Sequence, residues 1–292
     1  MILGINYSGY HDSAVALLSR SGKIIYAASE ERFSRVKKDG RFPHHCLSRI
    51  NLNEVTHVAV PYLANLPPKP PSDPFFSGIL LPRISDLSSY SPEWRERLDS
   101  LGKNLIFADH HLSHAACGFF LSGFEDALIV TADYGATNCL WNMGIYKAAS
   151  HDISPLHSAS YHHFYPLCAL YSDVTALLGF RPNVHEGKIT GLAAYGEDNP
   201  ICEEKLWAIF CEIHNRAIPL YYWTGWLDET SYPSLETNPA LVAHYRTKLS
   251  EFNDKQIAHA AQRITEKKLT QLIGRLREEY ASGSIKIGRA HV

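Results

Sequence analysis

The chain has 292 residues, of which 45% are hydrophobic and 11% aromatic, so it can bury a full core and is not disordered as a whole. Its formal net charge of -2 provides no broad basic field, which argues against nucleic acid or an anionic membrane as a partner and favours a small molecule. The six cysteines form no CxxC pair and no secretory or membrane-spanning segment is recognisable, so we expect reduced thiols in a cytoplasmic protein.

The first part of the chain predicts an α/β domain. Short apolar runs separated by turn residues predict three successive strands, at residues 2–6, 13–18 and 23–28. A helix over 45–50 and a strand over 57–61 then complete a first α/β segment, residues 1–65. Residues 66–91 are rich in Pro, Ser and Asp and predict a long surface loop, because proline lacks the amide hydrogen that helices and sheets need.

Residues 92–286 continue the alternation of helices and strands. Helices are predicted over 92–101, 111–121 and 165–178, and strands over 104–108, 127–132, 139–146 and 156–160. The strands at 104–108 and 127–132 are expected to be buried.

A long amphipathic helix is predicted after Asn253, because Gln256 stands three residues on, as in a capping box. We expect its apolar face to cover the sheet. Residues 201–249 form an insertion without a motif, and residues 287–292 resemble a non-native tail that we leave out of the fold.

The strongest candidate site contains two histidines at the start of a predicted helix. His110 and His114 are four residues apart, so they share one helical face. With Asp133 after the strand 127–132, they offer two nitrogens and one carboxylate, a set suited to Fe(II), Zn(II) or Mn(II). The competing interpretation is that both histidines only cap and line the helix. His111 lies on another face and is a candidate to support the ligands or contact substrate.

Two polar segments near the N-terminus are further candidates. His11 beside Asp12, with Asn6 close in sequence, could act as a general base for a hydroxyl nucleophile, or form an ordinary polar turn. Arg32 and Arg35 could receive a phosphate, or belong to a solvated face.

A third candidate segment is Glu186-Gly187-Lys188, followed by the small residues of 191–196. Small residues permit an anion to approach the backbone closely, so Glu186 and Lys188 are candidates for phosphate or substrate binding. A packed helix bounded by glycines is the alternative, and the spacing is not that of a Walker loop.

Four segments in this order resemble the NodU/CmcH family of O-carbamoyltransferases. They are residues 2–6 with 11–14, 29–35, 110–115, and 186–188 with 191–196. The resemblance implies a Kae/TsaD-like domain with the α/β fold of actin-like ATPases, which is ribonuclease H-like, incomplete at its C-terminus.

In that family, carbamoyl phosphate and ATP yield carbamoyl adenylate in a YrdC-like domain, and the carbamoyl group then passes to a hydroxyl of a sugar or other natural product. The resemblance implies that His110, His114 and Asp133 bind a divalent metal, iron in the first place, and that His11 lies close to the transferred group. It also implies that the YrdC-like domain is missing, so we expect the fragment alone to lack turnover.

Three other functions fit part of the pattern. A tRNA threonylcarbamoyl transferase shares the fold and the histidine pair, but segments 11–14 and 30–33 fit the O-carbamoyl family better. A non-catalytic metal- or nucleotide-binding module would use the same residues without turnover. A simple metallohydrolase would leave the glycine-rich segment unexplained.

Overall fold

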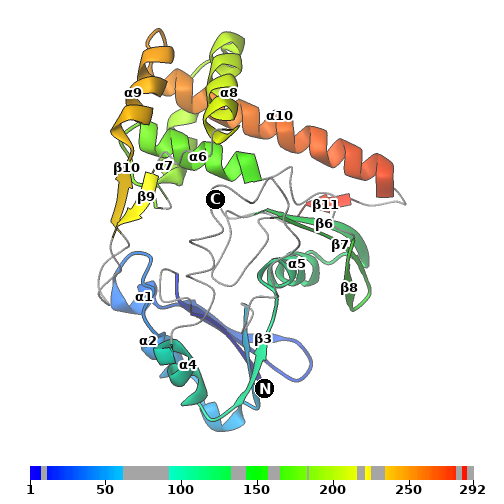
Figure 1. Cartoon of the computed structure of the whole chain (residues 1–292). Helices are drawn as coiled ribbons and strands as arrows, with labels where there is room; N and C mark the ends of the chain where they lie inside the picture. Colours follow the sequence, from blue (N-terminus) through cyan, green and yellow to red (C-terminus); the bar gives the residue numbers. More distant parts are fainter. Residues whose placement is uncertain are drawn as a thin grey trace.

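The computed structural model describes residues 1–7, 12–61, 92–132, 143–156, 165–182, 184–215, 221–224, 234–280 and 285–287. Among these residues, a five-stranded sheet lies at one end of the molecule, and a four-stranded sheet lies between the helix α5 and a group of helices from the second half of the chain (Figure 1). A separate two-stranded ribbon lies beside the helices.

The N-terminal sheet has the strand order β3-β2-β1-β4-β5. Its strands are β1 (Ile2–Asn6), β2 (Ala14–Leu18), β3 (Ile24–Ser29), β4 (His57–Val60) and β5 (Asn104–Phe107). β1, β2 and β3 form an antiparallel meander, whereas β4 and β5 run parallel to β1. This order is that of a ribonuclease H-like sheet, so the predicted α/β, ribonuclease H-like fold is confirmed.

One face of this sheet carries the first core. Leu3, Val15 and Val58 are buried because alternate strand residues point to the same face. Leu47 and Leu98 cover them from two short helices. The helical elements in this part are α1 (Glu31–Ser34), α2 (His44–Leu47), the 3-10 helix η1 (Leu52–Glu54) and α4 (Pro92–Asp99).

The second sheet is packed on both faces. Its order is β11-β6-β7-β8, with β6 (Asp126–Ala132), β7 (Met143–Ala149), β8 (Asp152–Pro155) and β11 (Ile285–Ile287). Ala127 and Ile129 face α5 (His110–Phe120), where they meet Phe119. Leu128 and Val130 point the other way into the helical core.

The helical layer consists of α6 (Tyr165–Leu177), α7 (Glu186–Ala193), α8 (Pro200–Asn215), α9 (Pro239–Lys248) and α10 (Asp254–Tyr280), beside the ribbon of β9 (Tyr221–Thr224) and β10 (Ser234–Thr237). The predicted capping box of α10 is confirmed. The Asn253 Oδ1 accepts a hydrogen bond from the Gln256 amide at 3.1 Å, and the Asn253 amide donates to the Gln256 Oε1 at 3.0 Å.

Two expectations for the first sheet and its helices are wrong. The strand at 104–108 was expected to be buried, but Ile106 is 46% exposed, because among the described strands β5 lies at the edge of its sheet and pairs with β4 alone. The helix expected over 45–50 is shorter, since α2 ends at Leu47. The loop predicted at 66–91 lies outside the described residues.

Two expectations for the second half also change, and a third is not tested. The strand predicted over 156–160 lies outside the described residues apart from its first residue, whereas a tight turn at Ser150, with φ of 56°, brings the strand β8 directly back along β7. Ile287, assigned to the tail, is the last residue of β11 and lies opposite Val130. The apolar face of α10 packs chiefly on α7 and α8, so it does not cover the sheet directly.

The insertion at 201–249 is packed where the structure describes it. Leu206 and Phe210 of α8 are fully buried in the core that α6 and α10 share. None of the described helices has the length and apolar character needed to cross a membrane.

Candidate functional site

The histidine pair lies on the first turns of α5. The Oδ1 of Asp109 accepts a hydrogen bond from the Leu112 amide at 2.8 Å and so caps the helix. The Nε2 atoms of His110 and His114 are 3.1 Å apart, and the Nδ1 of His110 lies 3.3 Å from the carbonyl oxygen of Pro61. A carbonyl can only accept, so Nδ1 carries the hydrogen and Nε2 turns its lone pair toward His114.

This geometry fits two ligands of one metal ion. Histidine nitrogens bind such ions at about 2.1 Å, so nitrogens 3.1 Å apart subtend roughly 95° at a shared ion. A hydrogen bond from a ligand's other ring nitrogen to a carbonyl is the usual support for a metal-binding histidine. Among the described residues, no group of three or more His, Cys, Asp or Glu side chains gathers into a metal site. Asp133 lies outside those residues, so its assignment as a ligand stays a prediction.

His111 connects the helix to the second sheet. It is 1% exposed, and its Nδ1 lies 2.9 Å from the Oγ1 of Thr131 on β6. The Thr131 hydroxyl donates onward to the carbonyl of Gly144 at 3.4 Å, so the His111 ring is the donor in its bond to Thr131. His111 thereby fixes the rotation of the turn that carries His110 and His114.

A second connection reaches the cap itself. The Tyr146 hydroxyl on β7 donates to the Oδ1 of Asp109 at 3.3 Å. A Cβ at Gly144 would overlap the Tyr146 ring, so only glycine leaves room for this side chain. Thr131 and Tyr146 were not predicted, because nothing in their local sequence indicates a contact with α5.

The structure brings two of the N-terminal candidates together. The Nδ2 of Asn6 donates to the carbonyl oxygen of Asp12 at 2.8 Å. Asp12 has a φ of 55°, a left-handed conformation that is uncommon for a non-glycine residue and occurs often at functional sites. The Asp12 amide also donates to the carbonyl of Lys38 at 3.4 Å. His11 lies outside the described residues, so its role stays a prediction.

Both candidate arginines lie at the surface. The Arg32 side chain is 75% exposed and only 3.8 Å from Glu31, and Arg35 is the exposed C-cap of α1 with a φ of 60°. Phosphate contact by either residue stays a prediction.

The neighbouring Glu30 has a structural role that the sequence did not reveal. It is 2% exposed and accepts hydrogen bonds from the amides of His45 and Cys46, both at 3.0 Å. The Nδ1 of His45 also lies 2.6 Å from its carboxylate. Burial by itself would raise the pKa of Glu30, but the two amides and the His45 ring together lower it. Glu30 therefore joins the end of β3 to the start of α2.

Glu186 and Lys188 begin α7 but make different contacts. The Ser172 hydroxyl donates to the Oε1 of the buried Glu186 at 3.2 Å. The Lys188 ammonium lies over the Phe180 ring, 5.3 Å from its centroid. A Cβ on Gly196 would collide with the backbone of α10, so packing accounts for this glycine without an anion. Phosphate binding by Lys188 stays a prediction.

Several cations surround the residue before α7. Burial lowers the pKa of His185, and the charges of Lys188, Arg181 and Lys38 lower it further, against the opposite effect of Glu186. Lys38 comes from the loop after α1, so the charges of the N-terminal part and of α7 act on the same imidazole.

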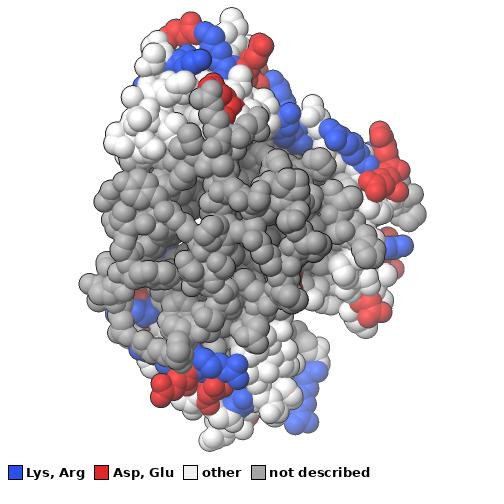
Figure 2. Space-filling view, in the orientation of Figure 1, with Lys and Arg blue, Asp and Glu red and all other residues white. Residues whose placement is uncertain are grey.

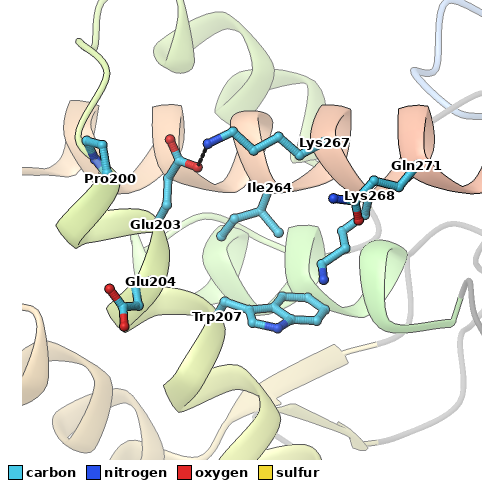
Figure 3. Close-up of a pocket in the computed structure, with 8 residues that line it drawn as sticks. All are labelled: Pro200, Glu203, Glu204, Trp207, Ile264, Lys267, Lys268 and Gln271. Carbon is cyan, nitrogen blue, oxygen red and sulfur yellow. Dashed lines mark hydrogen bonds and ion pairs between the residues drawn. The ribbon is translucent and has the colours of Figure 1, made fainter.

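A groove between α8 and α10 has a volume of about 280 Å³ (Figure 3). Lys268 lies over its Trp207 ring at 4.7 Å, and Phe210 stacks on the same ring at a centroid distance of 5.5 Å. Glu203 and Lys267 form an ion pair along one side. The side chains of the groove thus contact one another and join the two helices.

Figure 2 shows Lys and Arg interspersed with Asp and Glu on the described part of one face.

The fold and the histidine pair together define an α/β protein with a ribonuclease H-like sheet and a candidate metal centre at the start of a helix. The family described as Carbamoyltransferase N-terminus matches residues 1–59 and 93–287, so the chain belongs to that carbamoyltransferase family.

Three curated relatives are similar to the chain. An uncharacterized protein, sll1178, from Synechocystis is 33% identical over 67% of this chain and 35% of its own length. An uncharacterized protein, MJ1051, from Methanocaldococcus jannaschii is 27% identical over 96% and 48%. Nodulation protein NolNO from Sinorhizobium fredii is 28% identical over 65% and 28%. The chain thus spans less than half the length of each.

Two solved structures resemble the chain only distantly. A ROK family protein from Streptococcus pneumoniae in complex with sucrose is 12% identical, with a TM-score of 0.39 over 99% of this chain and 93% of that one. Full-length HypF in a phosphate- and nucleotide-bound form is 10% identical, with a TM-score of 0.39 over 98% and 48%.

Proposed function

We propose that this chain provides the carbamoyl-transfer site of an O-carbamoyltransferase, in which a hydroxyl of a sugar or other natural product accepts the carbamoyl group. The observation that supports the proposal is the 3.1 Å separation of the His110 and His114 Nε2 atoms, with the His110 Nδ1 held at the Pro61 carbonyl. Because the chain belongs to the carbamoyltransferase family, carbamoyl transfer is the reaction that we assign to a metal bound by this pair.

In the proposed site, His110, His114 and Asp133 hold a divalent metal, Fe(II) in the first place and Zn(II) or Mn(II) otherwise. The metal, when bound, supplies positive charge that stabilises an anionic phosphate leaving group. Asp109 and His111 keep the two ligand histidines in place, since one caps the helix and the other ties it to β6.

The N-terminal residues act on the acceptor in this proposal. His11 takes the proton of the attacking hydroxyl, and the hydrogen bond from Asn6 to the Asp12 carbonyl fixes the residue that follows His11 in the sequence. Arg32 and Arg35 would contact the phosphate of the donor.

The start of α7 would complete the binding surface. There Lys188 contacts phosphate and Glu186 contacts substrate, in the region where Lys38 and Arg181 add positive charge. In this proposal, the donor is carbamoyl adenylate, made from carbamoyl phosphate and ATP by a YrdC-like domain.

Metal content tests the centre of the proposal. The protein is purified anaerobically and its metals are measured by mass spectrometry for the wild type, for the His110→Ala, His114→Ala double variant, and for His151→Ala. His151 is an exposed histidine between β7 and β8, so it is a matched control.

We expect near-stoichiometric iron, or zinc or manganese, in the wild type and in the control, and its loss in the double variant with an unchanged circular dichroism spectrum. Equal metal in the double variant, or none in the wild type, would show that the histidine pair is no metal site in this chain.

A further inference from the structure

His259 of α10 lies between two hydrogen-bond acceptors. Its Nδ1 is 2.9 Å from the carbonyl oxygen of Ala193, the last residue of α7, and its Nε2 is 2.9 Å from the Oδ1 of Asp198. A carbonyl and a carboxylate can only accept, and an imidazole donates from both nitrogens only when it is protonated. The observed geometry is therefore satisfied by the imidazolium form alone.

The turn between these two acceptors packs closely against α10. Gly196 lies so near the Lys255 carbonyl and the His259 Cβ that no larger residue fits there. Asp198 also forms an ion pair with Arg263, whose Nε lies 3.3 Å from the Asp198 Oδ1. The residues 194–199, which connect α7 with α8, thus depend on α10 for their position.

We propose that His259 and Asp198 form a proton-operated latch, which holds the turn at 194–199 against α10 while His259 is protonated and releases it when His259 loses its proton. The latch does not depend on the proposed carbamoyl transfer, because it uses neither the histidine pair nor a metal. It bears on that site only through α7, whose first turn carries Glu186 and Lys188.

The direction of the pH effect follows from the two pKa shifts. The hydrogen bonds to Asp198 and Ala193 raise the pKa of His259, against burial and the charge of Arg263. The stabilisation that His259 provides is therefore complete below its pKa in the unfolded chain, about 6.5. It is lost as the pH rises through the higher pKa of His259 in the folded chain. His259 and Arg263 lower the pKa of Asp198, so the latch also opens in acid, below about 3.8.

Other charges near the latch are already paired. On α10, Glu266 accepts from Arg263 at 2.7 Å and adds negative charge toward His259. Glu203 of α8 pairs with Lys267. From α6, the Tyr171 hydroxyl contacts Gln262, which is neutral. His259 is thus the member of the latch whose charge changes between weakly acidic and weakly alkaline pH, whereas Asp198, with its lowered pKa, stays ionised over that range.

Hydrogen exchange measured by mass spectrometry on the intact chain tests the latch. The peptide containing residues 194–199 is followed at about pH 6 and about pH 8.5, corrected for the intrinsic pH dependence of exchange. The variants are His259→Gln, which does not titrate, and Asp198→Asn, which removes the carboxylate. The control is His244→Gln, since His244 of α9 lies 3.8 Å from Glu212 in an ordinary surface pair.

In the wild type and the control, we expect the turn to lose protection between the two pH values. In His259→Gln, the turn should be unprotected from exchange at both pH values. In Asp198→Asn, the turn should lose protection at a lower pH than in the wild type. Equal protection of the wild type at both pH values overturns the latch. If His259→Gln does not fold, nuclear magnetic resonance titration of His259 in the wild type decides, because a folded pKa at or below about 6.5 also overturns it.

Discussion

Replacing Glu30 with alanine removes the acceptor for two backbone amides and should strongly destabilise the N-terminal sheet. The amides of His45 and Cys46 would keep no carboxylate partner, and the site is buried. Hydrogen bonds to a charged group contribute roughly 1.5–3 kcal/mol each, and partial entry of water reduces the loss, so we expect about 3 kcal/mol. Glu30→Gln keeps one acceptor oxygen and should lose about half of that.

Urea unfolding followed by circular dichroism at pH 7 measures these losses. Glu125→Ala is the matched control, because Glu125 is exposed and a surface change of this kind costs less than about 0.5 kcal/mol. The pKa of Glu30 is lowered, so its contribution is present above about 4.5 and is lost as the pH falls through the folded value. The difference in free energy of unfolding between the wild type and Glu30→Ala should therefore become smaller in acid. A Glu30→Ala variant as stable as the control variant would refute the role of Glu30 as the acceptor that joins β3 to α2.

Three further changes test the supports of the candidate site by thermal unfolding. Asp109→Ala should cost about 1 kcal/mol through loss of the helix cap, and Asp109→Ser should restore most of it; equal stability of all three proteins would contradict the cap. Thr131→Val should cost about 1–3 kcal/mol because the buried His111 ring loses its partner, and a change below 0.5 kcal/mol would exclude that bond as a support. Gly196→Ala should cost at least about 1–3 kcal/mol because its Cβ meets the backbone of α10, whereas Gly187→Ala, with open space around it, should not destabilise.

The regular elements could largely be predicted because their signals are local. The three opening strands, α4, α5 and α6 all lie close to their predicted ranges, and the cap of α10 is formed by the two residues expected. The shared face of His110 and His114 follows from helix geometry alone. The wrong predictions concern features that a neighbouring element determines. One example is β5, whose exposure follows from its place at the edge of the described sheet.

The candidate site shows the same division. The sequence indicated which side chains could bind a metal, but not that Pro61 orients His110 or that Thr131 holds His111. Those partners are 49 and 20 residues away along the chain. The predictions for His11 and Asp133 still await a test, as do the phosphate roles of Arg32, Arg35 and Lys188.

By itself, the amino-acid sequence determined the α/β class, the resemblance to carbamoyltransferases, and the helical face that carries the histidine pair. Each depends on short segments whose signal is local, because the spacing of residues within a segment fixes which side chains share a face. Only the tertiary structure decided that Glu30 is a buried support, that α10 packs on helices, and that His259 faces both Ala193 and Asp198. Each of these depends on how distant segments pack, because burial and hydrogen-bond partners are set by the path of the whole chain and not by neighbouring residues.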